Sequence, residues 1–453
     1  MPHSEHRADI PVLPATARLL IAGGDERIEL DPVSGLNKYG CRPFPDSALL
    51  GFGSSTASTI SDGAYQAADR LRERLACAFD ESEVSGQMAR IRQELLDVVG
   101  CPGADLVFTA SGTDAHKFAA KYVQDRAGEK LTVVMVEEAE TGSGVAAALA
   151  TCGVEVRFVP LRTQDGEPRT AADIDRDFEV EIGRAAWVLL IMVDQSKTGL
   201  IAPTADFAAS MHRKYSEKLD VLVDACQFRV SVKTLRAYLQ QGFLIALTGS
   251  KFFSGPSFSA AVLLPDGCVP GTKNDSAGLV ERAGLLLRWE AALYEMRRFN
   301  ALPQEEIVRC LKMFADALEN RLDNDPSFIP LAVPRLDRRA LLADQGWDCQ
   351  QTIFPFMLRD PQSGLPIDRG WVRLIYRQLQ QDMSGIEDSK IARLRCQFGQ
   401  PVACGVRDGV EVGALRLCVG ARQIGFDRIQ GVISDALLAL DKTAWLATLQ
   451  LRD

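Results

Sequence analysis

Two short apolar runs near the middle of the chain organise its hydrophobic pattern. Residues 221–223 are apolar and lead into Asp224, and residues 244–247 lead into small polar residues followed by Lys251. Short apolar runs between polar residues predict buried strands of a parallel sheet. Ligands of such sheets lie outside the carboxyl ends of the strands. We therefore expect Asp224 and Lys251 to lie near a common ligand site.

The same alternation recurs through the first two thirds of the chain. Apolar runs at 106–109, 131–136 and 187–193 each lead into a turn or polar loop and then into a helical pattern. A helix is also expected from Ser61, which can cap it, and another at 87–100, where a glycine ends the pattern. Strands that alternate with helices at this spacing predict βαβ units and a mostly parallel sheet.

The last third of the chain predicts a smaller α+β unit. It consists of expected helices at 301–323, 371–381 and 426–440 and expected strands at 352–358 and 413–420. Residues 1–50 are rich in Pro and Gly and indicate an irregular arm. We therefore expect an α/β protein in three parts: an arm and segment at 1–75 that completes the small domain and the mouth of the site, a large domain at 76–300, and a small domain at 301–453.

Composition narrows the class of protein. The chain has 453 residues, 25% of them charged, and a formal charge of −9, which argues against a nucleic-acid surface. It has no apolar run long enough to span a membrane, and its start lacks the apolar core of a signal peptide. The 11 Cys show no paired spacing and the four His form no cluster, so we expect reduced thiols and no metal site. These features predict a cytoplasmic protein without a nucleic-acid or membrane partner.

The residue types at the two strand ends suit one cofactor chemistry. A pyridoxal phosphate enzyme needs a Lys for a Schiff base and an Asp beside the pyridinium nitrogen. Gly112 and Thr113 follow another expected strand and open a helix, whose free N–H groups can bind phosphate. The alternatives are a capping Asp224, a surface Lys251 and an ordinary tight connection at Gly112.

Four motifs in order resemble the fold-type-I pyridoxal phosphate enzymes, in particular the class V aminotransferase group that includes cysteine desulfurases and kynureninase. They are VFTASGTDA, VDACQ, LTGSKFFSGP and GALRLCVG. The resemblance implies a large domain with a mostly parallel, seven-stranded-type sheet, pyridoxal 5'-phosphate as cofactor, and a homodimer with active sites at the subunit interface. It implies that Lys251 is the Schiff-base lysine, Asp224 the partner of the pyridine nitrogen, Gln227 the neighbour of the ring's phenolic oxygen and Arg416 the group that binds the substrate carboxylate. Gly112, Thr113, Thr248 and Ser250 would contact the phosphate.

The chain also departs from the pattern of this family. Thr141 stands where the family usually stacks a His on the cofactor, and Ser196 is the counterpart of an Asn that contacts the phenolic oxygen. Ser250 replaces the usual His before the Schiff-base lysine. These departures indicate an unusual subgroup.

Further candidates have alternatives that the sequence leaves open. Ser54 and Ser55, at the mouth of the site, could bind substrate or simply form a capped loop. Arg288 could contact a phosphate or a second carboxylate across a homodimer, or lie on a helix surface beside a core Trp. His116 could lie near the ring or merely on its helix.

The resemblance implies an enzyme that acts on an α-amino acid through an internal aldimine at Lys251. We expect an aminotransferase, with a lyase acting by β-elimination or by Cβ–C or Cβ–S cleavage as the alternative. A desulfurase would need a nucleophilic Cys, for which Cys396 and Cys404 are the candidates. A non-catalytic member and a metal-dependent hydrolase are the other classes, and the identity of the amino acid stays open.

Overall fold

The computed structural model describes residues 13–127, 130–268, 277–342 and 346–449. Its larger part is a mixed sheet with the strand order β2-β9-β8-β7-β5-β3-β4, and β6 pairs with β5. The central strands β8, β7, β5, β3 and β4 run parallel, whereas β9 runs antiparallel to both of its neighbours. The strands are β2 (Asp105–Thr109), β3 (Leu131–Val136), β4 (Glu155–Val159), β5 (Trp187–Asp194), β6 (Ile201–Ala202), β7 (Leu219–Ala225), β8 (Leu244–Thr248) and β9 (Ala260–Leu264).

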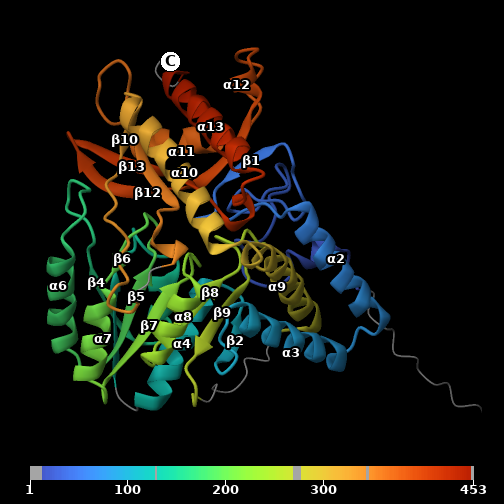
Figure 1. Ribbon diagram of the computed structural model, residues 1–453, viewed down its shortest axis with the longest axis vertical. Helices are drawn as coiled ribbons and strands as arrows, with labels where there is room; N and C mark the ends of the chain where they lie inside the picture. Colours follow the sequence, from blue (N-terminus) through green and yellow to red (C-terminus); the bar gives the residue numbers. More distant parts are fainter. Residues whose placement is uncertain (1–12, 128–129, 269–276, 343–345, 450–453) are drawn as a thin grey trace, which may run out of the picture.

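Helices cover both faces of this sheet (Figure 1). One hydrophobic cluster joins the sheet to α4 and α5, and a second, larger cluster joins it to α6, α7 and α8 and continues into the rest of the molecule. Strands buried on both faces need apolar residues at every position, which explains the continuous apolar runs in the sequence. The helices of this part are α3 (Glu81–Val98), α4 (Gly112–Ala127), α5 (Val145–Ala150), α6 (Ala171–Gly183), α7 (Ala205–Lys214), α8 (Val232–Gln240) and α9 (Leu279–Asn300).

The smaller part is a five-stranded sheet with the order β1-β12-β13-β11-β10. Its first strand comes from the N-terminal region and pairs parallel with β12, so two segments that are far apart in the sequence meet in one sheet. Its strands are β1 (Leu49–Phe52), β10 (Phe328–Pro330), β11 (Ile353–Leu358), β12 (Arg395–Arg407) and β13 (Val410–Cys418). Its helices are α10 (Gln304–Asn324), α11 (Arg369–Leu379), α12 (Lys390–Arg393) and α13 (Ile429–Leu449), and short 3-10 turns lie at Trp347–Cys349 and Ala421–Gln423.

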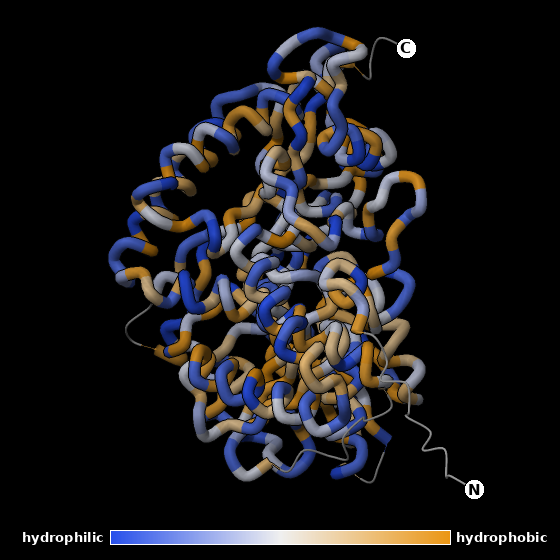
Figure 2. Tube along the Cα trace, turned by 90° about the vertical axis from the view of Figure 1, so that its right-hand side faces the viewer, coloured by the Kyte–Doolittle hydropathy of each residue, from blue (hydrophilic) through white to orange (hydrophobic). Residues whose placement is uncertain are grey.

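The N-terminal region before β1 is mostly turns, with one short helix, α1 (Thr16–Leu19), and it is followed by the long helix α2 (Asp62–Cys77). Ser61 accepts a hydrogen bond from the Ala64 N–H and caps α2, as its sequence position predicts. Figure 2 shows polar segments mainly on the outside of the molecule and hydrophobic segments concentrated inside. Within the described residues, no helix combines the length and the apolar character that a membrane crossing requires.

The predicted elements agree with the structure in type more than in extent. The expected helix at 87–100 begins earlier, at Glu81, because Asp80 caps it by accepting from the Glu83 N–H. Cys396 and Cys404, the candidate nucleophiles of a desulfurase, lie within strand β12, which the hydrophobic pattern does not predict. Gly399 and the Gln-Pro pair after it obscure this strand, because its pairing with β13 shifts register there.

Arg288 on α9 fixes the N-terminal arm from inside the protein. Its side chain is fully buried and donates to the carbonyls of Phe258 (2.8 Å) and Ala22 (2.7 Å), with longer contacts to those of Leu19 and Leu20. Burial lowers the pKa of the guanidinium, which has no carboxylate partner among the described residues. Arg288 therefore neither lies on the helix surface nor lines the cavity described below.

We expect Arg288→Ala to lower the free energy of unfolding by about 2–4 kcal/mol, because four carbonyls lose a buried, charged donor. The arm should also be cleaved faster in limited proteolysis. The matched control is Arg176→Ala, on the exposed face of α6. Equal stability and equal cleavage in both variants would contradict this role.

Candidate active site

A cavity of about 150 Å³ lies at the carboxyl ends of the central strands of the large sheet, next to the first turn of α4. Strand ends, the start of α4, the N-terminal arm and the five-stranded sheet all contribute to its wall. Among its lining residues are Ser55, Gly112, Thr113, His116, Thr141, Asp224, Gln227, Thr248, Ser250, Lys251 and Arg416. The residues that the sequence proposed for cofactor and substrate thus meet largely in one place.

Asp224 and Lys251 come from neighbouring parallel strands. Asp224 is near the end of β7 and Lys251 follows the end of β8, whose residues pair in register with those of β7. The Asp224 carboxylate lies 3.2 Å from Nε2 of His116, and it accepts from Thr141 Oγ1 (3.4 Å) and from the Cys226 N–H (3.1 Å). Burial disfavours its charge, but His116 and Lys251 outweigh burial and hold its pKa well below the usual range. Asp224 is therefore a permanent buried anion.

His116 holds this anion from the side of α4. Its Nδ1 lies 2.7 Å from the carbonyl oxygen of Gly112, one turn earlier, which fixes the orientation of the ring. Burial opposes protonation, but the charge of Asp224 more than compensates and raises the pKa of His116. His116 therefore lies in the wall of the candidate cofactor site, next to Asp224. Its position on the helix alone did not show this.

The start of α4 suits a phosphate group. A side chain at Gly112 would come within 3.0 Å of Cys226 Sγ, so this position keeps the backbone of the first turn accessible. Thr113 and Ser257 present hydroxyl groups to the cavity, and Arg27 of the arm reaches to within 3.5 Å of Thr113 Oγ1. Thr248 lines the cavity too, but its hydroxyl donates to the Cys226 carbonyl.

Several polar atoms of the wall are buried and have no hydrogen-bond partner in the described protein. They are Ser55 Oγ, His116 Nε2, both side-chain polar atoms of Gln195, Gln227 Oε1 and Ser257 Oγ. His116 Nε2 is close to Asp224 but is not aligned as a hydrogen bond. Buried polar groups are almost always paired in folded proteins, so this concentration indicates a polar ligand that pairs with them. Together with a lysine, a buried anion and a phosphate-type helix start, it fits pyridoxal phosphate.

The loop after β5 is positioned by a buried carboxylate, Glu140. Its oxygens accept from Arg162 Nε (3.0 Å), Ser196 Oγ (2.7 Å) and Thr198 Oγ1 (2.6 Å). Ser196 therefore points to Glu140 and does not line the cavity, whereas Gln195 before it does. The residue of this loop that lines the cavity is therefore Gln195, one position before the expected Ser196. Gln195 has an amide side chain, like the Asn that is usual in the family, and this amide was the sequence feature that could have indicated it.

Arg416 reaches the cavity from β13 of the five-stranded sheet and is buried. It donates to the Gln400 carbonyl through Nε (3.0 Å) and Nη2 (2.6 Å), to Thr56 Oγ1 (2.9 Å) and to the Lys197 carbonyl (3.2 Å). These neutral partners orient the guanidinium without neutralising it. Such a group can bind a carboxylate.

Some residues lie elsewhere than the sequence proposed, and others were missed. Ser54 lies outside the cavity, because its hydroxyl accepts from Arg229 (2.9 Å) and contacts the Val419 carbonyl. The arm contributes Arg27 and Tyr39, which no local motif marks. Lys197 also lines the cavity and had not been singled out.

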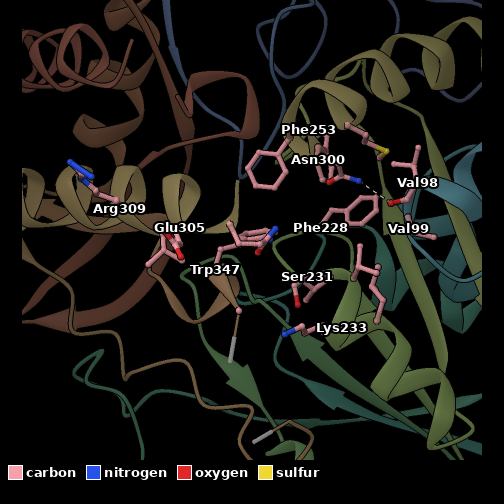
Figure 3. A pocket seen from close by; sticks show the side chains of 18 of the residues that line it. Val98, Val99, Phe228, Ser231, Lys233, Phe253, Asn300, Glu305, Arg309 and Trp347 are labelled. Carbon is pink, nitrogen blue, oxygen red and sulfur yellow. Dashed lines mark hydrogen bonds between the residues drawn. The ribbon is translucent and has the colours of Figure 1, made fainter. Parts of the chain in front are cut away.

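A larger hollow lies elsewhere in the described structure. It has a volume of about 720 Å³, and among the described residues none of those lining it lines the Lys251 cavity. Figure 3 shows its mainly apolar wall, with Phe228, Phe253 and Trp347, and the hydrogen bond from Asn300 to the Val98 carbonyl. It lacks the unpaired polar groups that mark the smaller cavity, so chemistry rather than volume identifies the candidate site.

Comparison with known proteins agrees with this site. Residues 78–257 match the family model described as aminotransferase class-V. This segment resembles the class-V aminotransferases. It contains Asp224, Lys251 and the start of α4, and enzymes of this family depend on pyridoxal phosphate.

Solved structures with similar folds extend the likeness over most of the chain. A cystine C-S lyase, C-DES, in complex with cysteine persulfide is 16% identical, with a TM-score of 0.56, over 87% of this chain and 98% of the other. The cysteine desulfurase CsdA from Escherichia coli is 15% identical, with a TM-score of 0.53, over 87% and 95%. Oryza sativa TDC with PLP and tryptamine is 14% identical, with a TM-score of 0.55, over 87% and 83%. The chain thus has the fold of the fold-type-I enzymes, and a sequence search of curated proteins finds no match.

The His116–Asp224 pair predicts a pH-dependent contribution to stability. Because the pKa of His116 is raised in the folded state, its contribution is complete below the unfolded value of about 6.5 and is lost as the pH rises through the folded value. We expect His116→Gln to lower the melting temperature of the cofactor-free protein more at pH 6 than at pH 9. His212→Gln is the control, because the pKa of His212 is lowered. A loss from His116→Gln that is equal at both pH values would contradict the charged pair.

Proposed function

We propose that this protein is a pyridoxal-phosphate-dependent enzyme of the class V type that acts on an α-amino acid with Lys251 as its catalytic lysine, and that it is an aminotransferase. The observation that carries the proposal is the arrangement around one cavity of Lys251, the ionised Asp224, the unpaired amide of Gln195 and the unpaired Oε1 of Gln227. The match of residues 78–257 to the class-V model supports it independently.

When bound, pyridoxal phosphate supplies an aldehyde for the Lys251 amine and a ring that accepts the electron pair of a bond broken at Cα. Asp224 would hold the ring nitrogen protonated, because its own pKa is too low to take up the proton. Gln195 and Gln227 would pair with the remaining polar atoms of the ring. The first turn of α4, with Gly112 and Thr113, would hold the phosphate.

The substrate would be oriented by Arg416. A guanidinium that binds the carboxylate would hold the carboxylate away from the axis perpendicular to the cofactor ring. The Cα–H bond would then be the bond that breaks. Lys251 is then the group that removes and returns the Cα proton. This arrangement favours proton transfer at Cα over loss of the carboxylate, and it is the sequence of events that an aminotransferase needs.

A carbon–sulfur lyase is the second candidate, because two of the similar structures are described as a cystine C-S lyase and a cysteine desulfurase. Both routes begin with the same proton removal, and they differ in whether a group leaves from Cβ. The desulfurase version, with a thiol nucleophile from β12, is disfavoured. Burial raises the pKa of Cys396 to about 12 and that of Cys404 to about 11, so neither is a thiolate at neutral pH.

The covalent role of Lys251 is tested by reduction with borohydride after cofactor loading. We expect the peptide that contains Lys251 to gain the mass of the cofactor. Lys251→Ala should abolish this label and lower the activity by at least about 10²-fold. Lys312→Ala, in the hollow of Figure 3, should keep both. A label on another lysine would refute the assignment. Release of an oxo acid supports transamination, whereas release of ammonia or sulfide from cysteine or cystine identifies the lyase.

The buried thiols predict a pattern of alkylation. Iodoacetamide at pH 8 should modify the exposed Cys77 of the native protein and leave Cys396 and Cys404 unmodified, and Cys396→Ala and Cys404→Ala should retain activity. A persulfide on either of these two residues after incubation with cysteine would contradict this prediction and support the desulfurase alternative.

A further inference from the structure

The cavity wall holds a second cation beside Arg416. Lys197 lines the cavity from the loop after β5, and its own carbonyl accepts from Arg416 Nη1 (3.2 Å). The two residues come from different domains and are joined by this bond. Two positive side chains therefore face the space in which the substrate of the proposed reaction would lie.

The protein does not neutralise either cation. Lys197 Nζ donates to the carbonyl of Glu138 (3.1 Å), and Arg416 donates only to carbonyls and to the hydroxyl of Thr56. Among the residues described, no carboxylate comes within ion-pair distance of Lys197 or Arg416, although Lys197 is only partly exposed and Arg416 is buried. Buried cations are ordinarily paired, so an unpaired couple that lines a cavity indicates a ligand with matching negative charge.

The nearest candidate partner within the protein is already engaged. Both oxygens of Glu140 are occupied by Arg162, Ser196 and the Thr198 hydroxyl, and the Lys197 N–H binds the Glu140 backbone carbonyl (2.9 Å). The loop is thereby fixed, while its lysine side chain has a neutral partner, the Glu138 carbonyl, and no carboxylate partner among the described residues. Burial, followed by the charges of Arg416 and Lys251, lowers the pKa of Lys197 to about 8, which reflects the missing anion.

We propose that the substrate is an amino acid with an anionic side chain, whose second acidic group is bound by Lys197 while Arg416 binds the α-carboxylate. This inference rests on the proposed function. The cofactor phosphate has its own binding group at the start of α4, with Arg27 nearby, and the α-carboxylate takes Arg416. Lys197 is then the cation left for a side-chain carboxylate or a sulfinate of similar shape. It is a specificity-determining residue and takes no part in proton transfer.

Unreactive acids test this on the cofactor-loaded full chain. Succinate and glutarate are compared with butyrate and valerate, which have the same chain lengths and one carboxylate, by titrating the absorbance of the bound cofactor. We expect the diacids to bind at least about 10-fold more tightly, as a partly buried charge-assisted pair implies. Lys197→Gln should remove this preference, Lys197→Arg should retain it, and Lys214→Gln, on an exposed part of α7, should leave it unchanged.

The pH dependence gives an independent readout. Four charged groups act on Lys197: Arg416 and Lys251 lower its pKa, and Glu138 and Glu140 raise it. With burial included, the pKa of Lys197 is about 8. The preference for diacids should therefore decline as the pH rises through about 8 in the wild type and persist in Lys197→Arg.

The outcomes separate this inference from the proposed function. Equal affinity for monoacids and diacids, or equal weakening of both by Lys197→Gln, would overturn the specificity while the cofactor label on Lys251 stands. Failure to load any cofactor on Lys251 would overturn the proposed function itself. With amino acids as ligands, aspartate or glutamate should change the cofactor spectrum at concentrations at which alanine does not.

Discussion

The buried pair of Glu140 and Arg162 is the interaction on which the site depends. It joins the loops that follow β3, β4 and β5, and Arg162 also donates to the carbonyl of Ala332 in the C-terminal part of the chain. Removing one member of such a pair leaves an uncompensated buried charge. The pair therefore fixes the positions of these loops and is not a source of net stability. The loop that it fixes carries Gln195 and Lys197 and, through a carbonyl, orients Arg416.

A second constraint is the use of arginines without carboxylate partners. Arg229, Arg288 and Arg416 are all buried, and they donate hydrogen bonds to carbonyl and hydroxyl oxygens of distant segments. Burial lowers the pKa of each. Backbone oxygens hold these cations in place but leave their charge, so the interior contains positive side chains without carboxylate partners although the chain as a whole has a charge of −9.

The sequence predicted best those features that depend on short stretches. Asp224 and Lys251 follow apolar runs, and strand ends of a parallel sheet meet at one edge, so their proximity could be inferred without the structure. Gly112 likewise marks the start of a helix. Ser196 was proposed instead of Gln195 because the register of a loop depends on a distant carboxylate, Glu140, which no local pattern reveals.

Features that depend on contacts between distant segments could not be predicted from the sequence. Arg27 and Tyr39 lie in an irregular arm, and long-range contacts such as the bond from Arg288 to the Ala22 carbonyl and that from Gln397 to the Tyr39 carbonyl hold this region over the site. Arg288 itself gives a polar signal in the sequence that is typical of a surface position, yet it is buried. Strand β12 was hidden by a glycine and a proline that a register shift accommodates.

The pairing of β1 with β12 has a consequence for the synthesis of the chain. Leu49 pairs with Arg395, so β1 leaves the ribosome well before the strand with which it pairs. The large sheet can form while the chain is still growing, but the small sheet, and with it Arg416, can join only after β12 and β13 have been made. Until then the nascent protein has no complete pocket, and its ligands can bind only molecules in which both sheets have formed.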